Sequence, residues 1–451
     1  MFEKDSLVLL QEALELLEQG FTGLPNYEEQ PDMERMRQVL YKVAVKMQDN
    51  YPYHHPYYIG QMLKPPHPIA RLAYMLAMWI NPNNHALDGG RASSSMEKEA
   101  VAKIAAMFGW DTHLGHLTGG GTMANMEALW VSGKLHPDKK IAASSQAHYT
   151  HSRITEVLKI PFVSIPTDKY SRIDVLALRE LLETEDIGTV VVTLGTTATG
   201  AIDPLPAILE LQKEFNFRIH ADCAYGGYFT LADNLAENGR AAYDRISEVD
   251  SIVIDPHKHG LQPYGCGCVL FKDPVVGQFY KHDSPYTYFT AAELHLGEIS
   301  LECSRAGAAA VGLWATMEMF PTETGGEFAE GLTKSRKAAL QLYNQLQHDD
   351  RYMVTFAPEL DIVIFAPKAA TTSEVSALSQ AIFDETANND LHMALTNLPK
   401  SLLGEWWDDM TWDGDKVACL RTCLMKPEHL DWMPQIWDVL DKSTNAVLST
   451  V

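Results

Sequence analysis

The stretch Asp255-Pro256-His257-Lys258-His259-Gly260 places one lysine directly after an apolar run, residues 251–254. Such a run is typical of a buried strand. Upstream, residues 217–222 predict a second strand that ends on Asp222. Each polar residue alone has an ordinary explanation, because lysines at strand ends are usually solvated and aspartate is a common turn former. Together they predict two reactive groups at one edge of an α/β sheet.

A lysine and an aspartate in this arrangement suit the chemistry of pyridoxal phosphate. The lysine amine can form a Schiff base with the cofactor, and the aspartate can pair with the pyridine nitrogen and keep it protonated. A protonated ring withdraws electrons from the substrate's α-carbon. The sequence therefore predicts a cofactor site built on Lys258 and Asp222.

The turn Gly119-Gly120-Gly121-Thr122 precedes a predicted helix, residues 123–135. Glycines let backbone amides approach an anion closely, and a helix N-terminus favours negative charge. The turn lacks the Gly-Lys-Ser/Thr of a Walker A motif and the second half of a dinucleotide fingerprint. A flexible loop is the alternative, but a monophosphate site fits best.

Two further polar segments follow predicted strands. His148 lies in residues 145–152, where a ring-stacking role and a solvated surface position are equally compatible with the spacing. Residues 195–204 carry the hydroxyls of Thr196, Thr197 and Thr199 toward the same predicted edge. Their Gly and Pro content is also what an ordinary strand-to-helix turn needs.

Composition excludes several classes of protein. The 451 residues are 46% hydrophobic, with a formal net charge of −23, so nucleic acid and anionic membranes are not expected partners. Six cysteines without a zinc-finger spacing predict free thiols, no metal site and a reducing, cytoplasmic location. Residues 1–5 do not resemble a secretory signal, and no stretch has transmembrane length.

The order of patterns predicts an α/β protein with three parts. Helical spacing dominates residues 6–19, 33–47 and 69–79, which predicts an N-terminal helical arm over 1–90. Strands and helices alternate over 91–320, which predicts a large domain with a mostly parallel sheet whose last two strands, 251–254 and 267–271, could pair antiparallel. Residues 321–451 predict a smaller α+β domain, with 388–416 irregular.

These motifs together resemble the group II pyridoxal-phosphate-dependent amino-acid decarboxylases, which include the aromatic amino-acid, glutamate and cysteine-sulfinate decarboxylases. The resemblance covers nearly the whole chain. It is carried by His55-Pro56-Tyr57, residues 94–99, 119–125, 148–152, 195–197, 220–227, Asp255-Pro256-His257-Lys258 and Leu420-Arg421. It implies the fold-type I architecture, with a seven-stranded sheet, and a homodimer with shared active sites.

The resemblance also implies residue roles. Lys258 matches the Schiff-base lysine, Asp222 the partner of the pyridine nitrogen, and His148 the stacking histidine. Arg421 matches an arginine that binds the substrate α-carboxylate. The remaining matches are cofactor contacts: Ala224 on the other ring face, Gly121, Thr122 and His257 near the phosphate, and Thr196 near the 3-hydroxyl.

The segment 281–290 lies where the family places its catalytic loop, although residues 282–305 align imperfectly with it. The family uses a loop tyrosine to return a proton to the carbon that loses CO₂, and relatives with phenylalanine there release an aldehyde. We expect Tyr288 to be the donor, with Tyr286 second and His295 as a further candidate. Packing of both tyrosines at a dimer interface is the alternative.

The expected activity is α-decarboxylation of an L-amino acid to an amine. An aromatic substrate is favoured mildly by the aromatic residues in 51–58, which core or dimer packing explains equally well. The alternatives keep the cofactor but change the bond: an oxidative deaminase that releases an aldehyde, or a carbon–carbon lyase. A non-catalytic scaffold is disfavoured by the intact Lys258–Asp222 pair.

Overall fold

The computed structural model describes residues 3–25, 27, 30–86, 89–281 and 299–449. Its strands are β1 (Leu114–Thr118), β2 (Lys140–Ser144), β3 (Phe162–Ile165), β4 (Ile187–Thr193), β5 (Arg218–Asp222), β6 (Ser251–Ile254), β7 (Gly267–Phe271), β8 (Tyr352–Val354), β9 (Ile362–Pro367), β10 (Ala394–Pro399) and β11 (Lys416–Cys423). Its helices are α1 (Leu7–Gln19), α2 (Met33–Met47), α3 (Pro68–Met78), α4 (Arg91–Met107), α5 (Gly121–Leu135), α6 (Thr150–Leu158), α7 (Val175–Thr184), α8 (Leu205–Phe215), α9 (Glu237–Asp244), α10 (Gly307–Met319), α11 (Glu327–Gln347), α12 (Thr372–Asn388), α13 (Lys400–Leu403) and α14 (His429–Leu448).

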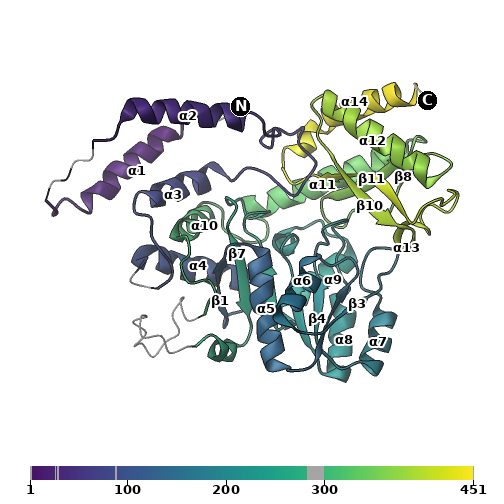
Figure 1. Ribbon diagram of the computed structural model, residues 1–451, viewed down its shortest axis with the longest axis horizontal. Helices are drawn as coiled ribbons and strands as arrows, with labels where there is room; N and C mark the ends of the chain where they lie inside the picture. Colours follow the sequence, from purple (N-terminus) through teal and green to yellow (C-terminus); the bar gives the residue numbers. More distant parts are fainter. Residues whose placement is uncertain (1–2, 26, 28–29, 87–88, 282–298, 450–451) are drawn as a thin grey trace.

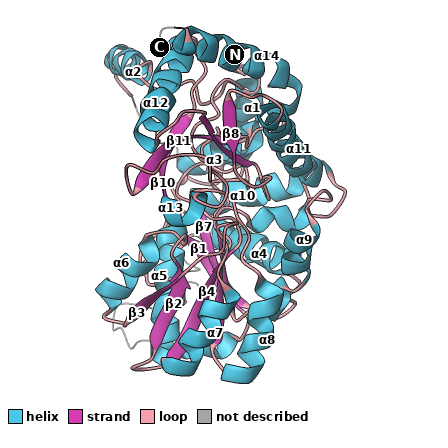
Figure 2. Cartoon of the chain, turned by 90° about the vertical axis from the view of Figure 1, so that its right-hand side faces the viewer, coloured by secondary structure: helices cyan, strands magenta, loops and turns pink. Residues whose placement is uncertain are grey.

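The larger of two sheets has seven strands in the order β1-β7-β6-β5-β4-β2-β3. Every residue of β4, β5's last four residues and all of β6 are buried, because helices cover both faces of the sheet (Figure 2). β7 pairs antiparallel with both β1 and β6, whereas the pairs among β2, β3, β4, β5 and β6 are parallel. The predicted antiparallel pairing of 251–254 with 267–271 is confirmed.

The smaller sheet has four antiparallel strands in the order β10-β11-β9-β8. Helices α11, α12 and α14 lie beside it (Figure 1). α12 begins with a capping box. The side chain of Thr371 accepts the backbone N–H of Glu374, and the side chain of Glu374 accepts the backbone N–H of Thr371. β10 and α13 both lie in residues 388–416, which the sequence pattern left irregular.

The first two helices extend away from both sheets (Figure 1). α2 has no buried residue, and its exposed side chains include Met36, Val39 and Leu40. The aromatic residues that follow pack on the small-sheet region instead: Tyr51 meets the ring of His392, and Tyr57 meets that of Trp432. These rings therefore serve packing within the chain.

The predicted α/β architecture, with one large mostly parallel sheet and a smaller α+β part, is confirmed. Four strands and α-helices escaped the sequence patterns: β1, β10, α9 and α13. None of the helices in the described part of the chain combines the length and hydropathy that a membrane-spanning segment requires.

Candidate active site

A cavity of about 540 Å³ lies at the edge of the large sheet where its parallel strands end. Side chains reach it from the turns after β1, β2, β4, β5 and β6, because parallel strands present their carboxyl ends at one edge. The lining residues are Gly119, Gly120, Gly121, Thr122, Met123, Asn125, Met126, His148, Thr150, Thr193, Gly195, Thr197, Asp222, Ala224, Tyr225, Asp255, His257, Lys258 and Tyr264.

Lys258 lies in the turn after β6, with its side chain in the cavity. Its Nζ is 3.1 Å from Oδ2 of Asp255, one turn earlier in the same loop. Asp255 is buried, and its Oδ1 has no hydrogen-bond partner among the described residues. The acid therefore holds the lysine ammonium within the cavity and keeps one oxygen available for a further donor.

Asp222, the last residue of β5, is buried and held from three directions. Its Oδ2 lies 2.8 Å from Nε2 of His151 and accepts a longer bond, 3.4 Å, from Asn125 Nδ2, while Oδ1 accepts the backbone N–H of Ala224 at 3.0 Å. Burial alone would raise the pKa of Asp222, but the hydrogen bond and charge of His151 hold that pKa well below its ordinary value. The carboxylate is thus kept ionised at the floor of the cavity.

Behind Asp222, a second histidine fixes Asn125. His220 Nε2 lies 2.8 Å from Asn125 Oδ1, and its Nδ1 lies 2.9 Å from Ser251 Oγ. Burial lowers the pKa of His220 to about 3, so this ring is uncharged. The amide of Asn125 is therefore oriented with its nitrogen toward Asp222.

The glycine turn opens α5 at the cavity wall. Gly120 has a φ of +152°, a conformation that side chains rarely adopt. At Gly121, a Cβ atom would lie 2.7 Å from Asp255 Oδ2, which is closer than real Cβ contacts. The turn thus brings bare backbone N–H groups and a helix N-terminus to the cavity.

Most of the residues predicted for the cofactor line this cavity: Gly121, Thr122, His148, Asp222, Ala224, His257 and Lys258. Two predicted residues do not. Thr196 is buried beneath the turn, where its hydroxyl lies 2.9 Å from that of Thr199, and Thr197 lines the cavity instead. Arg421 donates to the backbone carbonyls of Thr197 at 2.6 Å and Ala198 at 3.0 Å.

The predicted proton donors Tyr286 and Tyr288, and the further candidate His295, lie outside the described residues. Sequence reasoning missed His151, although the quoted segment 145–152 contained it. It also missed Asn125 and Asp255, each of which stands in a quoted motif. His151 stands three residues after His148, at the start of α6, and this spacing was the available signal for a second ring at the site.

Comparison with known proteins bears directly on this site. Residues 127–368 match the family model described as the pyridoxal-dependent decarboxylase conserved domain. The chain belongs to this family. It is a pyridoxal-phosphate-dependent amino-acid decarboxylase, as the sequence motifs predicted.

Relatives of this decarboxylase include a probable L-tyrosine/L-aspartate decarboxylase of Methanosphaera stadtmanae, 26% identical over 68% of this chain and 77% of the relative. The L-tyrosine decarboxylase of Enterococcus faecium is 25% identical over 74% of this chain and 72% of its own. The structure of Oryza sativa TDC with PLP and tryptamine has the same fold, with a TM-score of 0.78 at 16% identity, and covers 99% of both chains.

The residues of the decarboxylase site fit its cofactor. An ionised, buried Asp222 suits a protonated ring nitrogen, the amine of Lys258 suits the aldehyde, and the glycine turn suits the phosphate. When bound, pyridoxal phosphate withdraws electrons from the substrate's α-carbon and so permits loss of the carboxylate as CO₂. Burial lowers the pKa of His148, so its ring at the cavity wall is uncharged and suits contact with an aromatic face.

Proposed function

We propose that this decarboxylase converts an aromatic L-amino acid, with tyrosine as the first candidate, into the corresponding amine and CO₂. The observation that carries the proposal is the pair of relatives named for tyrosine, which match 68% and 74% of the chain. Tyr264 supports it, because its half-exposed ring lies at the cavity wall, 4.8 Å from the ring of His257. An aromatic substrate gains from such a surface.

In the proposed reaction, each residue has a distinct task. Lys258 would hold the cofactor through its aldehyde carbon, and its amine would be the group that a substrate amine replaces there. Asp222, oriented by His151 and Asn125, keeps the ring nitrogen protonated. His148, at the cavity wall, would contact a face of the cofactor ring. Tyr288, or Tyr286, returns the proton to the α-carbon.

The test of substrate and product is a screen of the common L-amino acids. The holoenzyme is incubated with each, and CO₂, amine, aldehyde and hydrogen peroxide are measured together. Tyrosine should give CO₂ and tyramine in equal amounts. Preferential turnover of aspartate or 2,4-diaminobutyrate would refute the aromatic assignment, and stoichiometric aldehyde with peroxide would establish the oxidative alternative.

Arg421 offers a planar fork that matches a carboxylate, and we propose that it binds the substrate's α-carboxylate. Arg421→Lys should raise the KM for the amino acid by about tenfold, the effect of roughly 1.4 kcal/mol. Inhibition by the product amine, which lacks the carboxylate, should change little. Arg421 also donates hydrogen bonds to the backbone carbonyls of Thr197 and Ala198, so its side chain could instead serve to hold that turn in place. Equal weakening of acid and amine would make Arg421 a positioning residue for that turn.

We also propose a cytoplasmic homodimer with three parts, an arm over 1–90, a large domain over 91–320 and a small domain over 321–451. The exposed apolar side chains of α1 and α2 support a second copy as the partner of the arm, because a soluble chain rarely exposes so many together. The mostly buried, unpaired cysteines support a reducing compartment. Sedimentation of the purified enzyme tests the dimer.

A further inference from the structure

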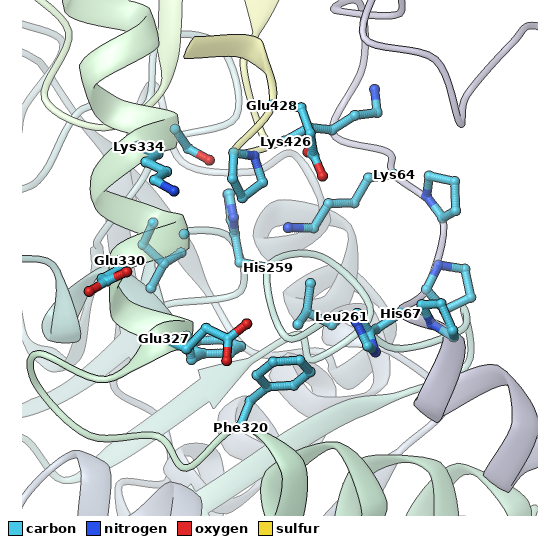
Figure 3. A pocket seen from close by; sticks show the side chains of 18 of the residues that line it. Lys64, His67, His259, Leu261, Phe320, Glu327, Glu330, Lys334, Lys426 and Glu428 are labelled. Carbon is cyan, nitrogen blue, oxygen red and sulfur yellow. The ribbon is translucent and has the colours of Figure 1, made fainter. Parts of the chain in front are cut away.

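A second cavity of about 520 Å³ lies between the segment after α2, the start of α11 and the turn before α14 (Figure 3). It shares no lining residue with the cavity that holds Lys258. The two are nevertheless neighbours, because His259 lines the second cavity and directly follows Lys258 in the chain. The proposed decarboxylation uses none of its residues.

Lys64 and Lys426 line this cavity, and neither forms an ion pair with any described acid. Lys64 Nζ donates to the backbone carbonyl of Met425 at 3.2 Å, and Lys426 Nζ donates to that of Tyr58 at 2.8 Å. Figure 3 shows the side chain of Lys64 reaching across the cavity toward His259. An ammonium group has three donors, so each lysine has donors to spare.

The surroundings disfavour these positive charges. Burial lowers the pKa of Lys64 to about 8, although the charges of Asp361 and Glu428 act in the opposite direction. Burial also lowers the pKa of Lys426 to about 7, and the neighbouring Lys64 lowers it further. An anion bound between the two ammonium groups would raise the pKa of both lysines.

His259 adds an unused acceptor. Only 1% of its surface is exposed, and its Nε2 lies 3.2 Å from Oδ2 of Asp361. Because a carboxylate only accepts, we assign the ring proton to Nε2, which leaves a lone pair on Nδ1. By strict geometry neither ring nitrogen of His259, nor Oδ2 of Asp361, has a hydrogen-bond partner among the described residues. The assignment of the proton therefore rests on the 3.2 Å approach of Nε2 to the carboxylate. A ligand that carries an O–H group would satisfy Nδ1.

The acids of this cavity lie at its rim. Glu327, Glu330 and Glu428 are exposed, as is Lys334, so water screens their charges. Lys426 and His259 are buried, and Lys64 is partly buried. The cavity therefore has two lysine amines and one imidazole at its floor, with the buried Asp361 behind His259, beneath a rim of mixed charge. Its other titratable lining groups are His54 and His67.

We infer that this second cavity is a binding site for a small oxyanion of the hydrogen phosphate type. Lys64 contacts its charged oxygens, and His259 Nδ1 accepts a hydrogen bond from its O–H group. The ligand is free inorganic phosphate or a phosphate ester, and the two differ in a testable way. A monoester dianion has no O–H group to give to His259, whereas hydrogen phosphate has one.

The experiment is calorimetric titration of the holoenzyme with inorganic phosphate at pH 8.5, in two buffers of different ionisation enthalpy. The cofactor fills the phosphate subsite of the active site, so the second cavity is the site under test. Lys64 is partly deprotonated at this pH, and bound phosphate restores its charge. We expect Lys64 to take up about three-quarters of a proton per phosphate, the fraction of its amine that is deprotonated at this pH. Sulfate, of similar shape but without an O–H group, should bind about tenfold more weakly.

Three variants complete the test. Lys64→Met should weaken phosphate binding at least tenfold. Lys64→Arg should retain binding but lose the part of the proton uptake that Lys64 contributes, because arginine does not titrate here. Lys334→Met, the same change at an exposed residue of the same cavity, should alter neither. Methyl phosphate that binds as tightly as inorganic phosphate would assign the site to esters and remove the role of His259. Equal binding by wild type and Lys64→Met, or no binding by wild type, would overturn the proposal.

Discussion

Lys258→Ala should lower the rate of decarboxylation by on the order of 10³-fold or more, because no other amine lines the cavity among the described residues. The cofactor should still bind through the glycine turn and Asp222, but without the absorption of a lysine-linked chromophore. Borohydride reduction of the wild-type holoenzyme, followed by peptide mapping, should find the cofactor attached to Lys258.

Lys272→Ala is the matched control, since Lys272 is exposed directly after β7 in the same domain. It should keep full activity and the wild-type spectrum. A reduced adduct on any lysine other than Lys258, or a Lys258→Ala enzyme within tenfold of the wild-type rate, would remove Lys258 from the chemistry.

Asp222→Asn should lower kcat by roughly 10²–10³-fold, the usual effect of removing one preorganised charge interaction. Asparagine keeps the shape of the side chain, but it cannot hold the ring nitrogen of the cofactor protonated. Much of the cofactor binding should remain, because the glycine turn is unchanged. Steady-state kinetics and the visible spectrum of the variant measure the two effects separately.

Asp250→Asn is a suitable control for this change. Asp250 precedes β6 at the opposite end of the strand, where it accepts the backbone N–H of Ile219 at 2.8 Å. Its replacement should cost stability without a comparable loss of kcat. Near-normal turnover of Asp222→Asn would show that the carboxylate only orients His151.

The sequence predicted most of the large sheet, and the two residues proposed to hold the cofactor, Lys258 and Asp222, both line the cavity. Both stand at the ends of strongly apolar strands, where the sequence pattern is clearest. β1 was missed because Gly115 and His116 interrupt its apolar pattern. The patterns indicate neither the pairing of β1 with β7 nor the 2.8 Å contact between His116 and Glu127. Such contacts join residues far apart in the chain.

The active-site details that escaped prediction depend on single-residue register. Thr196 and Thr197 are adjacent, and only the direction of the turn after β4 decides which hydroxyl reaches the cavity. His148 and His151 are three residues apart. It is His151, at the start of α6, whose ring contacts Asp222. Spacing alone could not assign these roles.

The contacts of Asp361 have a consequence for how the protein unfolds. Asp361 lies in the small-sheet region, yet it accepts a hydrogen bond from Tyr225 at 2.6 Å and faces His259, both in the large-sheet region. A fragment that ended near residue 320 would leave the Tyr225 hydroxyl and both nitrogens of His259 buried beside Lys258 without this acid. The two sheets are separate in topology, but these contacts couple their stability. We therefore expect both sheets to unfold together, in a single transition measured by calorimetry.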